Sequence, residues 1–320
     1  MSAYDEYDPD FIRITKPIKN RKPKQSKKRR FDDEPMRRGR LTEEERALLA
    51  ALRDEPEPQP LPDGADRWST WDTGERGPGP HPPWLVTELA AVDHELGVFK
   101  TGKEADVHLL RRSLPGGSSC LLAAKRYRDM DHRMFHRDAG YLEGRQMRKS
   151  REMRAMQQRS SFGRGMIAQQ WAVAEFTVLS SLWLAGVPVP YPVQRVGTEI
   201  LLEFLGSADG TAAPRLAALR PTPDELDELW RQLVDALVVL AEQGYTHGDL
   251  SAYNVLVHDG RLMLIDLPQA VDLAANPRGL EFLRRDADNI AGWFRARGAD
   301  EHLADPEELT VLLATAGNVM

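Results

Sequence analysis

The sequence predicts an α+β fold of two lobes, with a small β-rich first lobe and a mainly helical second lobe. Short apolar runs separated by Gly-containing turns dominate residues 98–127, whereas apolar residues at helical spacing dominate from residue 222 onward. With 320 residues, 41% of them hydrophobic, the chain can bury a sizeable core. We expect a functional cleft between the two lobes.

The first 82 residues are predicted to lie outside the folded domain. Phe11 to Arg30 carries ten Lys or Arg and no acidic residue, which predicts a disordered arm. Its expected partner is a polyanion such as RNA or a ribosome precursor, and a solubilising tail is the alternative. A short helix follows at residues 41–55, where Thr42 and Glu45 form a capping box, and then a Pro/Gly-rich linker.

The folded domain is predicted at residues 83–320, with lobes at about 83–205 and 206–320. The segment 82–100 is predicted to be a helix that leads into a strand, followed by a glycine turn and further strands up to residue 127. The expected order then continues with a charged, mobile insertion (128–165), a helix that ends at Gly186 (165–186), two strands joined at Gly197 (187–206), a long helix capped by Thr222 (222–244) and a last helix (281–297).

Four polar residues, His247, Asp249, Asn254 and Asp266, lie close together in the sequence after the long helix. The Asp259-Gly260 pair between two apolar runs predicts a hairpin that brings Asn254 and Asp266 to its open end, and Asp249 can face the same point. Carboxylate and amide oxygens suit Mg²⁺, and a further carboxylate can accept a hydroxyl proton. This pattern predicts phosphoryl transfer, with Asn254 and Asp266 on the metal and Asp249 as the base.

The alternative is that Asp249 and Asn254 only cap backbone turns. For His247 we expect such a role, because a histidine beside a catalytic loop more often holds the backbone than transfers protons. Upstream, the glycine turn TGKEADVH contains Lys103, and its backbone amides could cover phosphates. Lys125 at a strand end and Glu175 within a helix are individually unremarkable.

Five motifs in this order resemble the RIO family of atypical serine/threonine protein kinases: KTGKEADVHLL, AAKRY, THGDLSAYNVLV, LMLIDLPQAV and LEFLRRDADNI. The resemblance runs from about Val98 to Phe294, and the charged insertion matches as well. It implies a protein-kinase-like fold and a bacterial member of the family. We expect no counterpart of the family's separate winged-helix domain.

The resemblance also implies roles for individual residues. Lys125 would bind the α and β phosphates of ATP with Glu175 as its ion-pair partner, and Asp249 would be the catalytic aspartate. Asn254 and Asp266 would bind Mg²⁺, with Mn²⁺ as an alternative. The remaining expected contacts are the phosphate loop, Lys103, Glu104 and Ala105, and the hinge that holds adenine, Glu203, Phe204 and Leu205.

The sequence departs from ordinary protein kinases, because it has HGD for HRD, DLP for DFG, and no GxGxxG or APE segment. We therefore expect an ATP- and Mg²⁺-dependent serine/threonine kinase that also autophosphorylates. An ATPase switch in ribosome maturation is a further expectation, because the metal-binding aspartate itself accepts phosphate in some members of the family. The alternatives are an ATP-gated RNA-binding or ribosome-precursor-binding protein and a small-molecule kinase of the aminoglycoside or choline kinase type. A single cysteine, Cys120, and the lack of a long apolar stretch predict a cytoplasmic protein without membrane spans.

Overall fold

The computed structural model describes residues 60–102, 104–128, 161–267 and 270–319, with the backbone alone for 161–167. The described residues belong to one compact unit that begins at Pro60. The expected basic arm, the helix at 41–55, most of the charged insertion and Lys103 lie outside the described residues.

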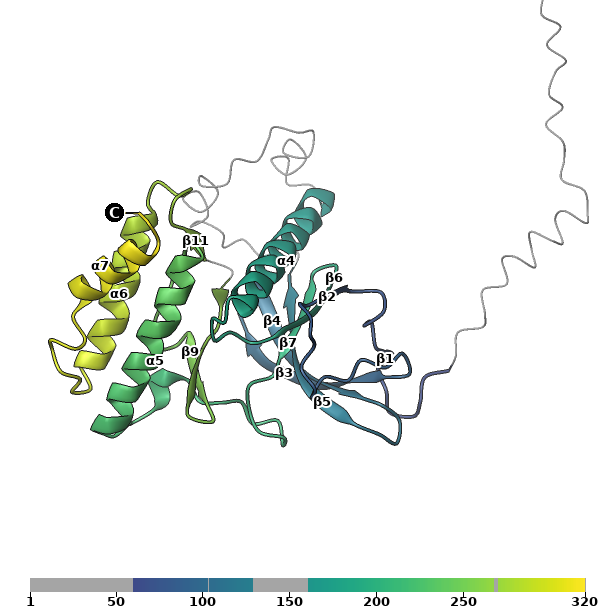
Figure 1. Cartoon of the computed structure of the whole chain (residues 1–320). Coiled ribbons are helices and arrows are strands. Elements are labelled where there is room, and N and C mark those ends of the chain that lie inside the picture. Colours follow the sequence, from purple (N-terminus) through teal and green to yellow (C-terminus); the bar gives the residue numbers. More distant parts are fainter. Residues whose placement is uncertain (1–59, 103, 129–160, 268–269, 320) are drawn as a thin grey trace, which may run out of the picture. The chain divides into compact units, whose positions relative to one another are not determined.

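A seven-stranded antiparallel sheet forms the N-terminal part of this unit, in the strand order β1-β3-β4-β5-β7-β6-β2 (Figure 1). Strands β3, β4 and β5 are consecutive in sequence and neighbours in the sheet, and their short connections suit antiparallel pairing. The strands are β1 (Arg67–Trp68), β2 (Glu75–Arg76), β3 (Val92–Thr101), β4 (Ala105–Ser113), β5 (Ser119–Tyr127), β6 (Pro192–Val196) and β7 (Glu199–Glu203).

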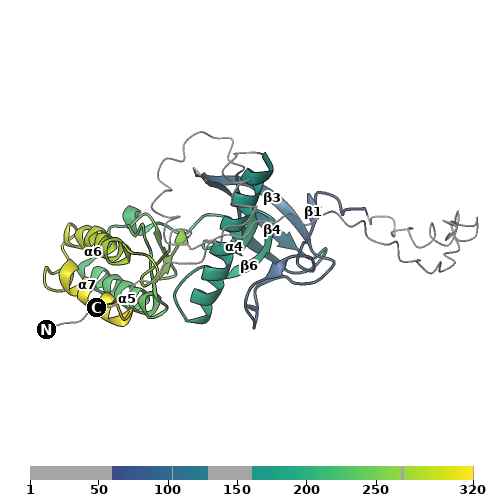
Figure 2. The same ribbon diagram turned by 90° about the horizontal axis from the view of Figure 1, so that it is seen from above.

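The C-terminal part is mainly helical, with two short two-stranded sheets. Its helices α5, α6 and α7 gather on one side, and helix α4 lies between them and the seven-stranded sheet (Figure 2). The elements are α4 (Ser161–Leu184), the 3-10 turn η1 (Leu216–Ala218), α5 (Pro223–Glu242), β8 (Tyr245–Thr246), β9 (Val255–His258), β10 (Arg261–Leu264), β11 (Val271–Asp272), α6 (Gly279–Arg295) and α7 (Pro306–Ala316). The predicted two-lobed α+β architecture is therefore confirmed.

Side chains along each strand point alternately to the two faces of the sheet, and both faces are buried. On one face, Leu110, Leu122 and Leu201 form a core with the segment that precedes β3. On the other face, Tyr127 and Ile200 pack against Phe176 of α4. A separate and larger core joins α5, α6 and α7 in the helical part.

The segment before Pro83 belongs to the sheet, so the expected start of the folded domain at residue 83 is corrected to Pro60. Strands β1 and β2 lie at the two edges, where β1 pairs with β3 and β2 pairs with β6. Each strand has two residues, and edge positions tolerate the Pro- and Gly-rich sequence around them. Trp71 from this segment is buried in the same core as Leu110, Leu122 and Leu201.

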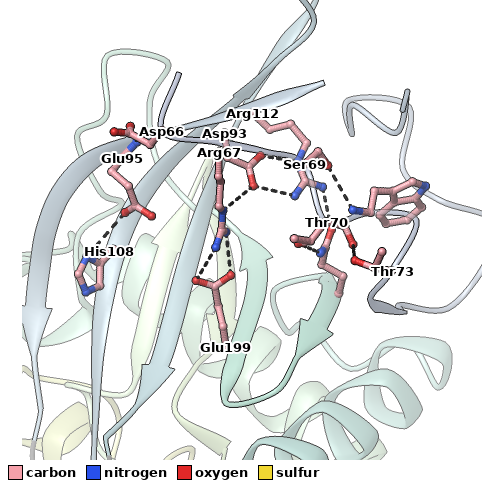
Figure 3. Close-up of polar contacts among 12 residues, drawn as sticks. Asp66, Arg67, Ser69, Thr70, Thr73, Asp93, Glu95, His108, Arg112 and Glu199 are labelled. Carbon is pink, nitrogen blue, oxygen red and sulfur yellow. Dashed lines mark hydrogen bonds and ion pairs between the residues drawn. The ribbon is translucent and has the colours of Figure 1, made fainter. Parts of the chain in front are cut away.

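A network of ion pairs fastens this segment to the sheet (Figure 3). The Arg67 guanidinium lies between two carboxylates, at 3.2 Å from Asp93 Oδ2 and 2.7 Å from Glu199 Oε1. Asp93 also accepts from the fully buried Arg112, with Nε at 2.8 Å from Oδ1. Because each buried charge has a partner of opposite sign, the network orders the segment instead of leaving unpaired charges in the interior.

The helix expected at the start of the segment 82–100 is absent, and β3 begins at Val92. Two register shifts in the β3–β4 pairing leave Leu96 and Phe99 without opposite residues in β4. These β-bulges break the alternation of a regular strand and give the apolar residues a spacing of three and four, which resembles a helix.

Most other elements agree with the sequence predictions. Helix α5 begins at the Thr222 capping box, in which the Thr222 side chain accepts from the Glu225 N–H and the Glu225 carboxylate accepts from the Thr222 N–H. The β9–β10 hairpin turns at Asp259 and Gly260, whose φ angles of 49° and 74° match the tight hairpin turn expected of Asp-Gly. Among the described residues, no helix is both long enough and apolar enough to cross a membrane.

Candidate active site

Lys125 and Glu175 form a buried ion pair between the sheet and helix α4. Lys125 lies near the end of β5, and its Nζ is 2.6 Å from Glu175 Oε1. Glu175 lies in the middle of α4, with its side chain 2% exposed. The second carboxylate oxygen of Glu175 accepts a hydrogen bond from the hydroxyl of Tyr127, which faces the same side of β5 as Lys125. Glu175 is thus held by two groups from one strand.

Asp266 provides a second carboxylate for Lys125 from the helical part of the protein. It follows the β9–β10 hairpin with φ at 65°, a left-handed conformation that is uncommon outside glycine. Its Oδ1 lies 3.4 Å from Lys125 Nζ, and its Oδ2 lies 2.9 Å from Lys100 Nζ of β3. Two ammonium groups therefore meet at one carboxylate.

The protonation states of this cluster follow from its charges. Burial by itself would raise the pKa of Asp266, but Lys125 and Lys100 outweigh it and lower the pKa from 3.8 to about 2. Burial would lower the pKa of Lys125, but the carboxylates of Glu175 and Asp266 keep it above its ordinary value. At neutral pH, Asp266 is a carboxylate and Lys125 is a cation.

Asp249 and Asn254 lie on the loop between β8 and β9, as the sequence predicts. Asp249 is exposed, and its backbone carbonyl accepts a 2.9 Å hydrogen bond from Asn254 Nδ2. This bond leaves Asn254 Oδ1 as the side-chain atom available to a cation. The Ile265 N–H donates to the Asn254 carbonyl at 3.0 Å, so the open end of the hairpin brings Asn254 beside the residue that precedes Asp266.

Helix α6 fixes the backbone of this loop through Asp286, which is 2% exposed. Its carboxylate accepts from Thr246 Oγ1 at 2.9 Å and from the N–H groups of Gly248 and Leu250 at 2.6 and 2.9 Å. The neighbouring Arg285 donates to the Gly248 carbonyl. Asp249 therefore lies between two backbone amides that α6 holds in place.

His247 is fully buried and bridges two parts of the site. Its Nε2 lies 3.0 Å from the Ile265 carbonyl, and its Nδ1 accepts from the Asp249 N–H at 3.4 Å. With Nδ1 as an acceptor, Nε2 is the donor, so the ring links the Asp249 loop to the chain that leads to Asp266. This contact pattern supports the backbone-holding role expected for His247.

The predicted hinge, Glu203 to Leu205, joins β7 to the helical part. Its Glu203 carboxylate accepts from the Tyr191 N–H at 3.0 Å, and burial raises the pKa of this carboxyl. Leu205 is buried, and its carbonyl accepts from the Ala213 N–H. The Phe204 ring meets the Phe99 ring edge-on, with centroids 6.0 Å apart.

The expected phosphate loop is described in part. Ala105 is buried at the start of β4, and its carbonyl accepts from the Gly102 N–H at 3.0 Å. The Glu104 carbonyl accepts from the Arg128 N–H. Of the predicted site residues, the structure brings Lys125, Glu175 and Asp266 into direct contact and brings Asn254 to the backbone of Asp249.

Sequence reasoning missed three residues at this site: Lys100, Tyr127 and Asp286. Lys100 and Tyr127 each lie within a quoted motif, but their orientation depends on strand register. Asp286 lies within the motif LEFLRRDADNI, and its contacts are with residues 36 to 40 positions earlier. An acidic residue in the apolar stripe of a helix was the available signal, because a buried carboxylate needs partners.

The donor set suits a magnesium–nucleotide complex. Asp266 and Asn254 offer the carboxylate and amide oxygens that Mg²⁺ prefers. Within the described parts of the chain, no three His, Cys, Asp or Glu side chains cluster to form a metal site by themselves. A cation held here would therefore need oxygens from phosphate and water to complete its coordination shell, as is usual for Mg²⁺.

A strand lysine is paired with a helix glutamate and with an aspartate from the helical part, and an Asp/Asn loop precedes the hairpin that leads to this aspartate. This arrangement is typical of a kinase-like fold. A family model described as "RIO1: RIO domain" matches residues 124–308, more than half of the chain. The chain belongs to the RIO family.

Named relatives agree with this membership. The chain is 35% identical over 205 residues to the RIO-type serine/threonine-protein kinase Rio1 of Haloferax volcanii, covering 64% of each protein. It is 34% identical over 213 residues to the serine/threonine-protein kinase RIO1 of Chaetomium thermophilum, and the match covers 64% of this chain and 40% of that protein. Less than two thirds of each relative is therefore matched.

Among solved structures, the chain is similar to the Rio2 kinase–ADP/Mg²⁺–phosphoaspartate complex from Chaetomium thermophilum. This similarity has a TM-score of 0.46 and 20% sequence identity, and it covers 70% of this chain and 67% of that one.

Proposed function

We propose that this protein is an ATP- and Mg²⁺-dependent serine/threonine protein kinase that also autophosphorylates. The observation that carries this proposal is the position of Lys125 Nζ, which lies 2.6 Å from Glu175 and 3.4 Å from Asp266. A cation fixed between two carboxylates from different parts of the molecule is a preformed binding point for phosphate. Membership of the RIO family supports the same activity.

Each residue then has a defined task in phosphoryl transfer. Lys125 binds the α and β phosphates, and Glu175 holds its ammonium group in position. Bound Mg²⁺ would neutralise phosphate charge, with Asp266 and Asn254 as its protein ligands. The hinge backbone at Glu203 and Leu205 would bind adenine, and Glu104 and Ala105 would flank the phosphates beside Lys103.

Asp249 completes the reaction as the acceptor of a proton. The hydroxyl oxygen of a serine or threonine bonds to the γ-phosphorus while the bond from that phosphorus to the ADP oxygen breaks. The hydroxyl proton passes to the Asp249 carboxylate. The exposure of Asp249 and the backbone bonds on either side of it support this role, because a substrate can reach a carboxylate that stays in place.

A second candidate is an ATPase switch in which Asp266 itself receives the phosphoryl group. Its side chain is 35% exposed and ionised at neutral pH, so it can act as a nucleophile. A carboxylate oxygen would bond to the γ-phosphorus as ADP leaves, and water would later hydrolyse the acyl phosphate to free Asp266 and inorganic phosphate. Such a cycle would suit a role in ribosome maturation.

A labelling experiment separates these activities. Purified protein is incubated with γ-labelled ATP and Mg²⁺, beside Asp249→Ala, Asp266→Ala and the control Asp235→Ala, an exposed aspartate on α5. Acid-stable label on serine or threonine that is lost in Asp249→Ala supports the kinase. Base-labile label that is lost in Asp266→Ala supports the switch. If wild-type protein acquires neither kind of label, both proposals fail.

The basic arm, Phe11 to Arg30, is proposed to bind RNA or a ribosome precursor. Ten positive charges without an acidic residue favour a polyanion through release of counterions. Deletion of residues 1–40 should weaken RNA binding and reduce its salt dependence while ATP turnover continues. RNA binding that does not respond to salt would contradict this role.

A further inference from the structure

Lys100 and Lys125 lie in one row of the sheet. In the β3–β4 pairing Lys100 is opposite Val107, and in the β4–β5 pairing Val107 is opposite Lys125. Residues directly opposite in neighbouring strands project to the same face of a sheet. Both lysines therefore project to the same face, two strands apart, with the aliphatic Val107 between them.

Asp266 is the point at which the two lysines meet. Lys100 Nζ binds Oδ2 at 2.9 Å, and Lys125 Nζ approaches Oδ1 at 3.4 Å, so each carboxylate oxygen has its own ammonium group. The bulge at Phe99, directly before Lys100, shifts the strand register and so fixes the direction of this side chain. Bulges of this kind are common next to active sites.

The two lysines differ in how firmly they are held. Lys125 is also bound by the buried Glu175, and its side chain is 10% exposed. For Lys100 the contact in the structure is Asp266, and its side chain is 34% exposed at the end of β3. Lys100 can therefore leave Asp266 by rotation of its own side chain, whereas Lys125 stays with Glu175.

We propose that Lys100 is a second phosphate-binding lysine, which holds Asp266 in the nucleotide-free protein and moves to the terminal phosphates when a magnesium nucleotide binds. The inference rests on the proposed function, because it takes Asp266 as a ligand of the metal. A divalent cation and the Lys100 ammonium group compete for the same oxygen, since both are cations that bind the carboxylate. The displaced ammonium group lies on the face of the sheet where Lys125 binds phosphate, so polyphosphate offers it a new partner.

The test compares Lys100→Met with a matched control, Arg111→Met, which removes an exposed cation from β4. Isothermal titration calorimetry gives the affinities for ATP and AMP in Mg²⁺. In Lys100→Met we expect affinity for ATP to fall about tenfold, as for loss of a charge-assisted hydrogen bond, with AMP changed less than about twofold. Lys100→Arg keeps the positive charge and should retain the preference for ATP over AMP.

A second readout needs no nucleotide. Electron paramagnetic resonance of free Mn²⁺ measures the affinity of the metal for the nucleotide-free protein. Loss of the competing ammonium group should raise this affinity about threefold in Lys100→Met, as expected for a partly exposed ion pair, and leave it unchanged in Arg111→Met. This increase is specific to competition at Asp266.

The outcomes separate the inference from the proposed function. If Lys100→Met weakens ATP and AMP equally, or leaves the ATP-to-AMP ratio unchanged, Lys100 does not bind the terminal phosphates. If Mn²⁺ binding does not increase, whether because both proteins bind alike or because neither binds, Lys100 does not compete with the metal. If the wild type itself fails to bind ATP in Mg²⁺, the proposed function is contradicted.

Discussion

Lys125 and Glu175 are 50 residues apart in sequence and meet at 2.6 Å in the interior of the protein. The pair joins β5 to α4, and Tyr127 from the same strand completes the hydrogen bonding of the glutamate. An ion pair in such a setting fixes the relative position of strand and helix, so it governs both the stability of the sheet and the position of the lysine.

Removal of Glu175 should destabilise the protein. In Glu175→Ala the buried Lys125 loses its closest partner, and we expect the free energy of unfolding to fall by about 3 kcal/mol. Urea denaturation followed by circular dichroism measures this change. The control Glu281→Ala removes a glutamate from an exposed pair with Arg278 and should leave stability nearly unchanged. Equal effects in the two variants would show that burial of the pair is unimportant.

Asp249→Asn should abolish phosphoryl transfer without affecting the fold. The amide cannot accept the hydroxyl proton, so we expect the rate of label transfer to fall at least about a hundredfold. ATP affinity should stay within about a factor of two, because no contact of the exposed Asp249 side chain holds the described structure together. A loss of ATP binding in this variant would instead place Asp249 in the nucleotide site.

Asp286→Asn tests whether helix α6 holds the loop that carries Asp249. The amide has one acceptor oxygen in place of two, and its NH₂ group would face the backbone N–H of either Gly248 or Leu250, which donate to different carboxylate oxygens. We expect a loss of about 3 kcal/mol in unfolding free energy, together with a reduced rate of phosphoryl transfer. Asp288→Asn, an exposed change on the same helix, is the control and should behave like the wild type.

The ion pairs of the N-terminal segment should make stability depend on pH. Burial alone would raise the pKa of Glu199, but Arg67 and Arg126 outweigh it and hold the pKa below its ordinary value of 4.5. In the unfolded chain the carboxylate takes up a proton at higher pH than in the folded protein. The stabilisation is therefore complete above a pH of about 4.5 and is lost as the pH falls through the lowered folded pKa.

Glu199→Gln removes this contribution. Unfolding free energies of the wild type and the variant should differ most at neutral pH, and the difference should shrink as the pH falls below about 4.5. Denaturation curves at pH 7 and pH 3 provide the comparison. A difference that is the same at both values would show that the Glu199 charge does not stabilise the fold.

The sequence was sufficient to predict the structure where residues that are neighbours in the chain determine the local backbone conformation. The Asp259-Gly260 turn has the backbone conformation that its residue types favour, and this hairpin determines where Asn254 and Asp266 emerge. Helix α5 likewise begins at its Thr222 cap. In both cases the residues that carry the signal are neighbours in the chain.

The sequence was insufficient to predict the structure where contacts between residues far apart in the chain determine it. Nothing near Arg67 indicates a strand, because β1 is two residues long and its place depends on pairing with β3 and on the charges of Asp93 and Glu199. The bulges of β3 depend on its register with β4, so the contact between Lys100 and Asp266 could not be read from the order of residues.

The central claim is that Asp266 and its neighbours form a magnesium–nucleotide site. Its most direct test is the affinity for ATP measured by isothermal titration calorimetry, with Mg²⁺ and with a chelator, in the wild type and in Asp266→Asn. We expect Mg²⁺ to strengthen ATP binding at least about tenfold in the wild type and less than about threefold in the variant. An ATP affinity of the wild type that does not change with Mg²⁺, or an equal effect of Mg²⁺ on the ATP affinity of both proteins, would contradict the assignment.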